Sequence, residues 1–282
     1  MIELHQVLFR HNGSDFELYV PSLRLKPGIT LLVGRNGAGK SSLLQLLATA
    51  KFPDSGDIRF GGLTAPSDLP SIRSRIGFVP SGVELYEQMT PVKLLRYFGE
   101  LKGIVDHDEQ ERLLEAFRLN RCREARIKTL PQGVKQRLAL AQAWIASPTF
   151  LFFDEPLNAL DTLERAHFTR FTAANSSNRT IIVSTHEMNE WAAWADHVLW
   201  FDAGRPRFYG TANAWTEELP LRVWTGFVRE GTYRELDPGK LLHVRPDAGG
   251  FHVRLIDEHP PGAEFELAAT TLEDAYFIRC RT

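Results

Sequence analysis

A glycine-rich segment, GRNGAGKS, contains residues whose types and spacing suit the binding of phosphate groups. Its glycines allow the backbone to curl so that successive N–H groups point inward at anionic oxygens. Lys40 adds a positive charge for the β- and γ-phosphates, and the Ser41 hydroxyl is a hard oxygen ligand for Mg²⁺. The predicted phosphate-binding residues are Gly34, Arg35, Asn36, Gly37, Ala38, Gly39, Lys40, Ser41 and Ser42.

The sequence on both sides of this loop supports the prediction. Ile29–Val33 is a short apolar run typical of a buried parallel strand. Ser42–Ala50 has leucines at helical spacing. A strand, a glycine loop and a helix place the phosphates at a helix N-terminus, where the dipole and free N–H groups favour anions. We infer that the chain binds a nucleoside triphosphate.

A second apolar run, Phe150–Phe153, ends in two carboxylates, Asp154 and Glu155. The carboxyl ends of parallel strands are where ligands bind, so both side chains are expected near the phosphates. Asp154 suits Mg²⁺, directly or through water, and Glu155 suits general-base polarisation of the water that attacks a γ-phosphate. His186 ends the run TIIVSTH and can reach the same edge, although a lone histidine is as often structural as functional.

Alternating apolar runs and helical patterns predict an α/β fold interrupted by a helical insert. Ile2–Phe9 and Phe16–Leu25 flank the turn signal Asn12-Gly13, which predicts two antiparallel strands. Helical periodicity then dominates between about residues 81 and 146. Strands are expected next at 150–154, 180–186 and 197–201, and helices near 163–174 and at 188–195. The spacing of Trp191 and Trp194 on the last helix predicts that both lie in the core.

The composition beyond residue 210 differs from that of the preceding chain. Leu241–Val244 and Gly250–Leu255 resemble strands, and Thr270–Ile278 begins with a capping-box-like pattern. We predict a main domain over residues 1–210 and a small α+β appendage over residues 211–282, in which we find no chemical motif.

Charge and composition narrow the classes of function. With 33 basic and 35 acidic residues the formal net charge is −2, which gives no electrostatic case for binding nucleic acid. The longest uncharged stretch, Leu138–Phe153, is too short and too polar to span a bilayer. Two cysteines far apart in the sequence suit a reducing compartment. We therefore expect a soluble, cytoplasmic protein that reaches a membrane only through a partner.

These motifs, in this order, resemble the ATP-binding subunit of ABC transporters over about residues 2–210. The shared features are the phosphate loop, the FLFFDEP strand, the Asn158–Asp161 turn and STH at 184–186. The resemblance implies a P-loop NTPase with a mixed sheet and ATP hydrolysis, with ATP and Mg²⁺ as cofactors. Glu155 and His186 would be catalytic, and Ser41, Ser81 and Asp154 would stand at metal-binding positions.

The same resemblance implies partners. Two ATP-binding subunits would close face to face, so that each ATP lies between one phosphate loop and the other subunit's signature loop. The stretch from Gly77 to Gly103 and the ending TTLEDAYF look most like the exporter branch, whose permeases are separate membrane proteins. The chain would then be peripheral on the inner face of the cell membrane. The signature and dimer positions are Leu130, Pro131, Gln132, Gly133, Val134 and Asp161.

Two positions depart from the family pattern. Pro131 stands where the family has a serine that donates to the opposite γ-phosphate, and proline has neither a hydroxyl nor an N–H. Ser81 replaces the Q-loop glutamine and is too short to reach Mg²⁺ unless the backbone moves or a water bridges. The residue that stacks on adenine has no clear counterpart; His11, Phe9 and Phe16 are candidates.

Several readings of the whole chain stay open. An intact phosphate loop beside a degraded signature suits an asymmetric heterodimer, while a homodimer with two slow sites is the alternative. A motor subunit of an exporter is favoured over a soluble ABC-type ATPase that acts on DNA or ribosomes. A regulatory subunit that binds ATP and hardly hydrolyses it is the third reading, suggested by Pro131 and Ser81.

Overall fold

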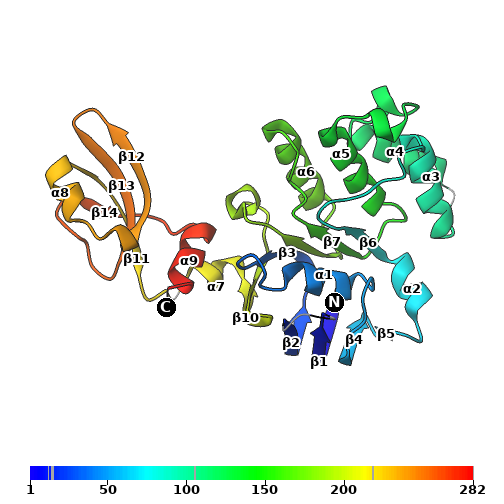
Figure 1. Ribbon diagram of the computed structural model, residues 1–282, viewed down its shortest axis with the longest axis horizontal. Coiled ribbons are helices and arrows are strands. Elements are labelled where there is room, and N and C mark those ends of the chain that lie inside the picture. The colour runs from blue at the N-terminus through cyan, green and yellow to red at the C-terminus, as the bar shows by residue number, and fades with distance from the viewer. Residues whose placement is uncertain (12, 14–15, 105, 218, 282) are drawn as a thin grey trace. The chain divides into compact units, whose positions relative to one another are not determined.

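The computed structural model describes residues 1–11, 13, 16–104, 106–217 and 219–281. The chain divides into two compact units, Met1–Tyr209 and Gly210–Thr282 (Figure 1). The first unit is α/β with strands of both orientations, as the sequence predicts. The second is a smaller α+β unit.

An antiparallel sheet begins the first unit. The strands β1 (Ile2–Arg10) and β2 (Glu17–Leu25) pair from Ile2 with Leu25 to Arg10 with Glu17, which confirms the expected strand pair. Asn12 of the expected turn lies outside the described residues. On the other side of β1 lie β4 (Ser55–Phe60) and then β5 (Leu63–Thr64).

The second sheet carries the predicted chemical residues at one edge. Its order is β10-β9-β3-β8-β7-β6. These strands are β3 (Gly28–Val33), β6 (Ile76–Val79), β7 (Phe150–Asp154), β8 (Thr180–Ser184), β9 (His197–Asp202) and β10 (Arg205–Thr211). Parallel pairing aligns Leu32 with Ser184 and Ser184 with Asp154, so the carboxyl ends of three strands meet.

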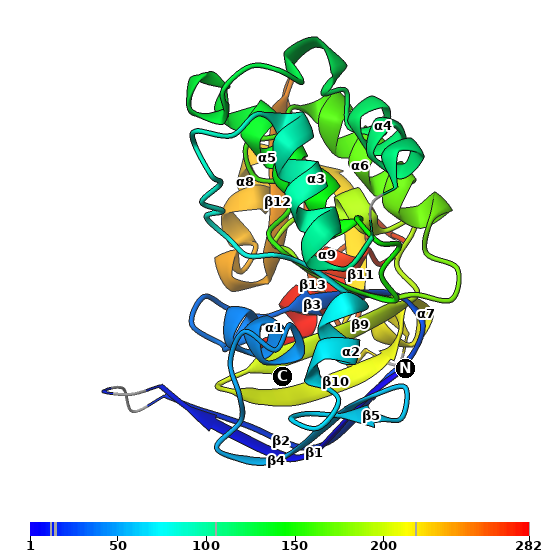
Figure 2. The ribbon, with the colours of Figure 1, turned by 90° about the vertical axis from the view of Figure 1, so that its right-hand side faces the viewer.

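Helix α1 (Lys40–Leu47) lies between the two sheets (Figure 2). Its buried leucines belong to one apolar core with Leu4 and Val20 of the antiparallel sheet and Phe152 of the parallel sheet. Because α1 is buried on two opposite faces, its axis is fixed. Its N-terminus lies at the edge of the parallel sheet where the carboxyl ends of the strands meet. Helix α2 (Leu69–Ser74) follows β5.

The expected helical insert consists of α3 (Pro91–Leu101), α4 (His107–Ala116) and α5 (Gln132–Ala143), with short 3₁₀ turns at 120–122 and 127–129. Thr90 caps α3, with Pro91 in the first helical position as predicted. Helix α5 begins immediately after Pro131, because proline is compatible with a helix start. Helix α6 (Thr162–Ala174) follows β7 and lies beside α5 and α4 in Figure 2.

The expected helix at 188–195 is wrong in type and length. Only a 3₁₀ turn forms, Met188–Trp191, and Trp191 is fully buried against Phe168 while Trp194 is 39% exposed. The segment ends at Asp196, whose carboxylate accepts a hydrogen bond from the backbone N–H of Ile29 at the start of β3, so the chain is tied to the parallel sheet directly after residue 195. The prediction that both tryptophans lie in the core is therefore correct only for Trp191.

The second unit is a four-stranded antiparallel sheet of order β12-β13-β11-β14 with three short helices. The elements are α7 (Ala212–Thr216), β11 (Arg222–Val228), α8 (Glu230–Glu235), β12 (Leu241–Asp247), β13 (Gly250–Asp257), β14 (Phe265–Leu267) and α9 (Leu272–Arg279). Thr271 and Asp274 form the predicted capping box of α9. Sequence patterns missed β11 and β14.

A half-buried lysine attaches the helical insert to the parallel sheet. The ammonium of Lys102, at the end of α3, donates to the carbonyl oxygens of Ile76 (2.8 Å) and Ile145 (2.9 Å). Burial lowers the pKa of Lys102 to about 8, although the nearby Glu109 carboxylate raises it in part. The insert is thus anchored by a cation that titrates close to neutrality.

We expect this lysine to make stability depend on pH. Between pH 8 and the ordinary value of 10.5 the unfolded chain binds more protons than the folded chain, so the free energy of unfolding rises with pH. The rise from this residue should reach at most about 3 kcal/mol. Urea unfolding of the wild type and Lys102→Met, at about pH 7 and about pH 9.5, measures it. An equal difference between the two proteins at both pH values would contradict the prediction.

Candidate nucleotide-binding site

The glycine-rich loop between β3 and α1 has no room for side chains at two positions. A Cβ on Gly34 would lie 2.1 Å from the carbonyl oxygen of Phe201. At Gly39, φ is +103°, and a Cβ there would lie 2.7 Å from the ring of Phe16. Glycine is therefore required by close approach at the first position and also by backbone conformation at the second. The loop leaves α1 without a side-chain cap, so its first N–H groups are available to an anion.

Lys40 is held under this loop. Its side chain is buried, and the ammonium donates to the carbonyl oxygens of Gly34 (2.8 Å) and Arg35 (3.1 Å). Burial lowers the pKa of Lys40, while the negative charges of Glu155 and Asp154 oppose this by raising it. The two carboxylates therefore lie close enough to influence the same cation.

A cavity of about 470 Å³ opens above the loop, within the size range of small-molecule sites. It is lined by His11, Phe16, Asn36, Gly37, Gly39, Lys40, Ser41, Ser42 and Glu155. Six of the predicted loop residues thus share one cavity with Glu155, which is distant in the sequence. The other predicted residues of the loop and of the strand ends are not among those that line it: Gly34, Arg35, Ala38, Asp154 and His186.

The three aromatic candidates for the base differ in position. Phe16 and His11 line the cavity, whereas Phe9 is only 7% exposed and belongs to the core. His11 is engaged by its neighbours: Nε2 lies 2.9 Å from Ser42 Oγ, and Nδ1 lies 3.4 Å from Lys51 Nζ. Phe16 packs on Gly39 and has its ring at the cavity, so it is the better placed of the two.

The carboxylates at the end of β7 are held in two different ways. Asp154 is 4% exposed and accepts a hydrogen bond from the Ser184 hydroxyl. Glu155 follows with φ of +50°, a left-handed conformation that is uncommon for residues with a Cβ. Its Oε1 lies 3.2 Å from His186 Nε2, and its Oε2 accepts from the Asn158 amide at 2.8 Å. The structure therefore brings Glu155 and His186 together.

Two supporting residues, Ser184 and Asn158, lie in motifs that the sequence shows, but their role was not predicted. Ser184 accepts a hydrogen bond from the Glu155 N–H (3.0 Å) in addition to donating to Asp154, and so holds both carboxylate residues. Asn158 orients the Glu155 side chain. Only the parallel register of β7 and β8 places Ser184 opposite Asp154, and sequence patterns do not give register.

The remaining predicted residues lie outside the set that lines the cavity. Ser81 is exposed, two residues beyond the end of β6. Segment 130–134 leads into α5, with Leu130 buried and Pro131 and Gln132 exposed. Asp161 is exposed and caps α6. Exposure of these positions is compatible with contacts to another molecule.

The donor set fits a nucleoside triphosphate with Mg²⁺. The cavity offers free N–H groups, one ammonium and the Ser41 hydroxyl to phosphate oxygens and a hard cation. No group of three or more His, Cys, Asp or Glu side chains that could hold a metal occurs within the described ranges. Mg²⁺ usually has few protein ligands, because phosphate oxygens and water molecules complete its coordination shell.

A glycine loop at a helix N-terminus, on the carboxyl edge of a parallel sheet and facing two carboxylates, defines a P-loop nucleotide-binding protein. The family model described as "ABC transporter" matches residues 20–158. A solved structure described as the ATP-binding subunit of an ABC transporter superimposes with a TM-score of 0.71 at 23% identity, over 77% of this chain and 92% of that chain. That likeness confirms the expected fold.

Two curated relatives refine the assignment. The ABC transporter ATP-binding protein NatA of Bacillus subtilis is 30% identical over 199 residues, which cover 68% of this chain and 81% of that protein. The Nod factor export ATP-binding protein I of Cupriavidus metallidurans is 35% identical over 188 residues, 65% of this chain but only 62% of that protein. This chain belongs to the family of ABC transporter ATP-binding proteins. Within the described ranges, every helix is too short or too polar to cross a membrane.

We predict that Phe16 stacks on the base. Base–aromatic stacking contributes about 1–3 kcal/mol, so Phe16→Ala should weaken ATP binding about 5- to 150-fold. Titration calorimetry with ATP measures this, and tripolyphosphate, which lacks the base, is the control for an intact loop. His11→Ala should weaken ATP binding less than Phe16→Ala does. A similar loss of tripolyphosphate affinity, or a larger effect of His11→Ala on ATP, would show that Phe16 has another role.

Proposed function

We propose that this chain is the ATP-hydrolysing motor subunit of an ABC exporter. It closes on a second ATP-binding subunit around ATP, and hydrolysis drives a separate transmembrane permease. The observation that carries the proposal is the pairing of Glu155 with His186 at the cavity that Lys40 and Ser41 line. A phosphate site alone would bind nucleotide, whereas a carboxylate held at its edge can also activate water.

Each residue has a distinct part in the proposed hydrolysis. Lys40 and the N–H groups of the loop hold the β- and γ-phosphates and spread their negative charge. Glu155 accepts a proton from the water that attacks the γ-phosphate in line, and its orientation is maintained by Asn158. His186, 3.2 Å from Glu155, would contact the transferred phosphoryl group and the water.

Ser41 and Asp154 would hold Mg²⁺, which when bound neutralises charge on the phosphates. Ser41 lines the cavity, and the Ser184 hydroxyl keeps the Asp154 carboxylate in one orientation. The buried Asp154 would act directly or through water. Ser81, exposed beyond β6, would reach the ion only after a movement of its loop.

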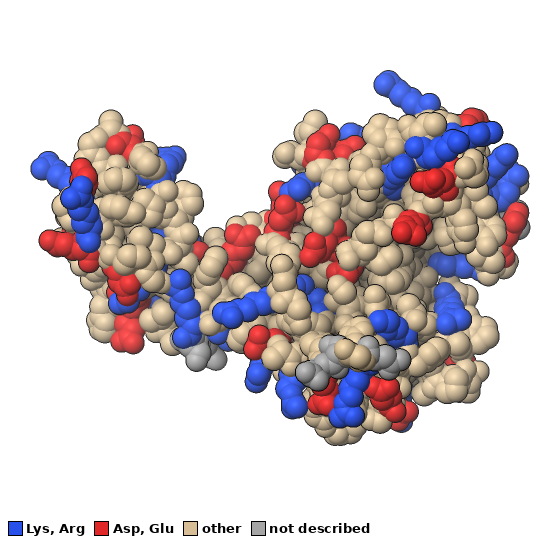
Figure 3. All heavy atoms as spheres, viewed as in Figure 1, with Lys and Arg blue, Asp and Glu red and all other residues tan. Residues whose placement is uncertain are grey.

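The permease, the direction of transport and the peripheral location at the inner membrane face belong to the same proposal. The relative named for Nod factor export supports the direction. A groove of about 640 Å³ lined by residues of α2 and α3 supports a protein partner, since the apolar side chain of Leu101 beside it is 63% exposed. Acidic and basic side chains are interspersed on the face of the first unit seen in Figure 3.

Replacing the proposed base tests hydrolysis. Glu155→Gln should lower the ATPase rate at least about 100-fold while ATP affinity is kept, because the amide cannot accept the proton of water. Steady-state phosphate release measures the rate, titration calorimetry measures the affinity, and light scattering with and without Mg-ATP measures the oligomeric state. Because hydrolysis is blocked, any dimer that closes around ATP should also accumulate. Full turnover by this variant would remove Glu155 from its assigned role.

Pro131 bears on whether the second subunit is another copy of this chain. Helix α5 starts at Pro131 without a side-chain cap, so the segment offers neither a hydroxyl nor that residue's N–H to a facing phosphate. Each missing contact to a charged group is worth about 1.5–3 kcal/mol. This weakness favours an asymmetric heterodimer, in which a partner completes the site of this chain, over a homodimer.

We expect Pro131→Ser to strengthen self-association. Serine supplies a helix cap worth about 1 kcal/mol and a hydroxyl for a facing phosphate. In the Glu155→Gln background with Mg-ATP, the dimer fraction at a fixed concentration should rise at least about fivefold. The midpoint of thermal unfolding without ATP measures the stabilisation by the helix cap alone. A raised midpoint with no gain in dimer would show that Pro131 does not limit association between identical chains.

A further inference from the structure

Helix α5 is attached to the turn of residues 155–161 that carries Glu155. The side-chain amide of Gln136 donates to the carbonyl oxygen of Pro156 at 3.0 Å. A Cβ on Gly133 would lie 3.0 Å from the carbonyl oxygen of Ala159, so the backbones of the helix start and the turn are in close contact. Both contacts come from the first turns of α5: Gly133 belongs to the 130–134 segment, and Gln136 follows it directly.

The 155–161 turn needs such support from outside. Glu155 and Ala159 have φ of +50° and +62°, which residues with a Cβ adopt only when their surroundings hold them. Within the turn, Asn158 bonds to Glu155 through its side chain and its backbone N–H. The contacts of α5 with Pro156 and Ala159 therefore support the turn from outside, while Asn158 and His186 contact the Glu155 carboxylate itself.

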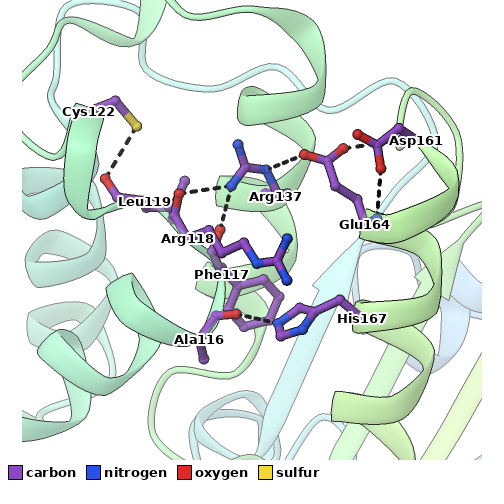
Figure 4. Close-up of polar contacts among 9 residues, drawn as sticks. All are labelled: Ala116, Phe117, Arg118, Leu119, Cys122, Arg137, Asp161, Glu164 and His167. Atoms are coloured by element: carbon purple, nitrogen blue, oxygen red, sulfur yellow. Dashed lines mark hydrogen bonds and ion pairs between the residues drawn. The ribbon is translucent and has the colours of Figure 1, made fainter.

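A third contact is a partly buried ion pair (Figure 4). Arg137 Nε of α5 lies 3.0 Å from Glu164 Oε1, and the two side chains are only 16% and 18% exposed. The other oxygen of Glu164 accepts from the Asp161 N–H (3.2 Å), and Asp161 accepts from the Glu164 N–H (2.8 Å). One carboxylate thus joins α5 to the end of the turn.

The same arginine also reaches α4. Arg137 Nη1 donates to the carbonyl oxygens of Phe117 and Arg118, both at 2.8 Å, just beyond the end of that helix. His167 of α6 contacts the Ala116 carbonyl oxygen at 2.6 Å. Figure 4 shows these side chains converging between the three helices, so the arginine joins parts of the insert to the core helix α6.

We propose that Gln136, Arg137 and Glu164 are positioning residues that make the 130–134 segment and the 155–161 turn move as one unit. ATP bound at this chain's own loop then shifts the surface that the chain offers to a second subunit. A partner's nucleotide that contacts the 130–134 segment acts back on Glu155 by the same contacts, because coupling between sites is reciprocal. This inference rests on the proposed function.

Hydrogen exchange with mass spectrometry on the full chain tests the coupling without requiring a dimer. Mg-ATP should slow exchange at residues 34–42 and 155–161 and also at residues 130–140, which do not line the cavity. Glu164→Gln keeps the length and the capping ability of the side chain but removes its charge. In this variant the slowing of hydrogen exchange by Mg-ATP at residues 130–140 should fall at least about threefold. The slowing at residues 34–42 should be unchanged.

Glu111→Gln is the matched control. It breaks the ion pair of Glu111 with Arg123 (2.6 Å), which lies inside the insert and does not reach the turn, so all three ATP effects should persist. Gln136→Met removes the bond to Pro156 and provides a second variant if Glu164→Gln fails to fold. An ATP effect at 130–140 that is absent in the wild type, or undiminished in both variants, would overturn the inference. A missing effect at 34–42 in the wild type would instead overturn the proposed function on which it rests.

Discussion

The burial of α1 between two sheets is the constraint on which the nucleotide site depends. Leucines of this helix pack against the antiparallel sheet on one side and the parallel sheet on the other. The helix cannot slide or tilt without opening apolar surface on both, at a cost of about 25 cal/mol per Å². Its uncapped N-terminus is therefore fixed at the edge where β7 and β8 end.

That fixed edge explains how a buried cation and two carboxylates coexist. Removing Lys40 from water disfavours its charge, and the low pKa that burial causes is opposed by Glu155 and Asp154. The carbonyl oxygens of Gly34 and Arg35 satisfy the ammonium in this arrangement. A triphosphate can take over those contacts because it brings negative charge to the same point, so the loop is preorganised for an anion.

Local sequence determines much of this architecture. The phosphate loop, the apolar run before Asp154 and the Thr90-Pro91 helix start each follow from residue types at short spacing, and the structure has the expected elements there. The sequence-based predictions are wrong where contacts between distant parts of the chain determine the secondary structure. The 188–195 segment has helical periodicity, but it forms only one 3₁₀ turn before Asp196, which is bonded to Ile29 of the distant strand β3. Strands β11 and β14 were missed because only their pairing defines them.

The same distinction applies to the site. Glu155 and His186 were expected at one edge because strand ends meet there, and they lie 3.2 Å apart. Ser184 and Asn158, which hold the carboxylates, depend on register and on a left-handed turn that no sequence pattern specifies. A non-glycine residue in that conformation at the proposed catalytic position is held by Ser184 and Asn158, and α5 contacts the turn that follows it at Pro156 and Ala159. Helix α5, which follows the 130–134 segment, therefore also contacts the turn that carries the proposed water-activating residue.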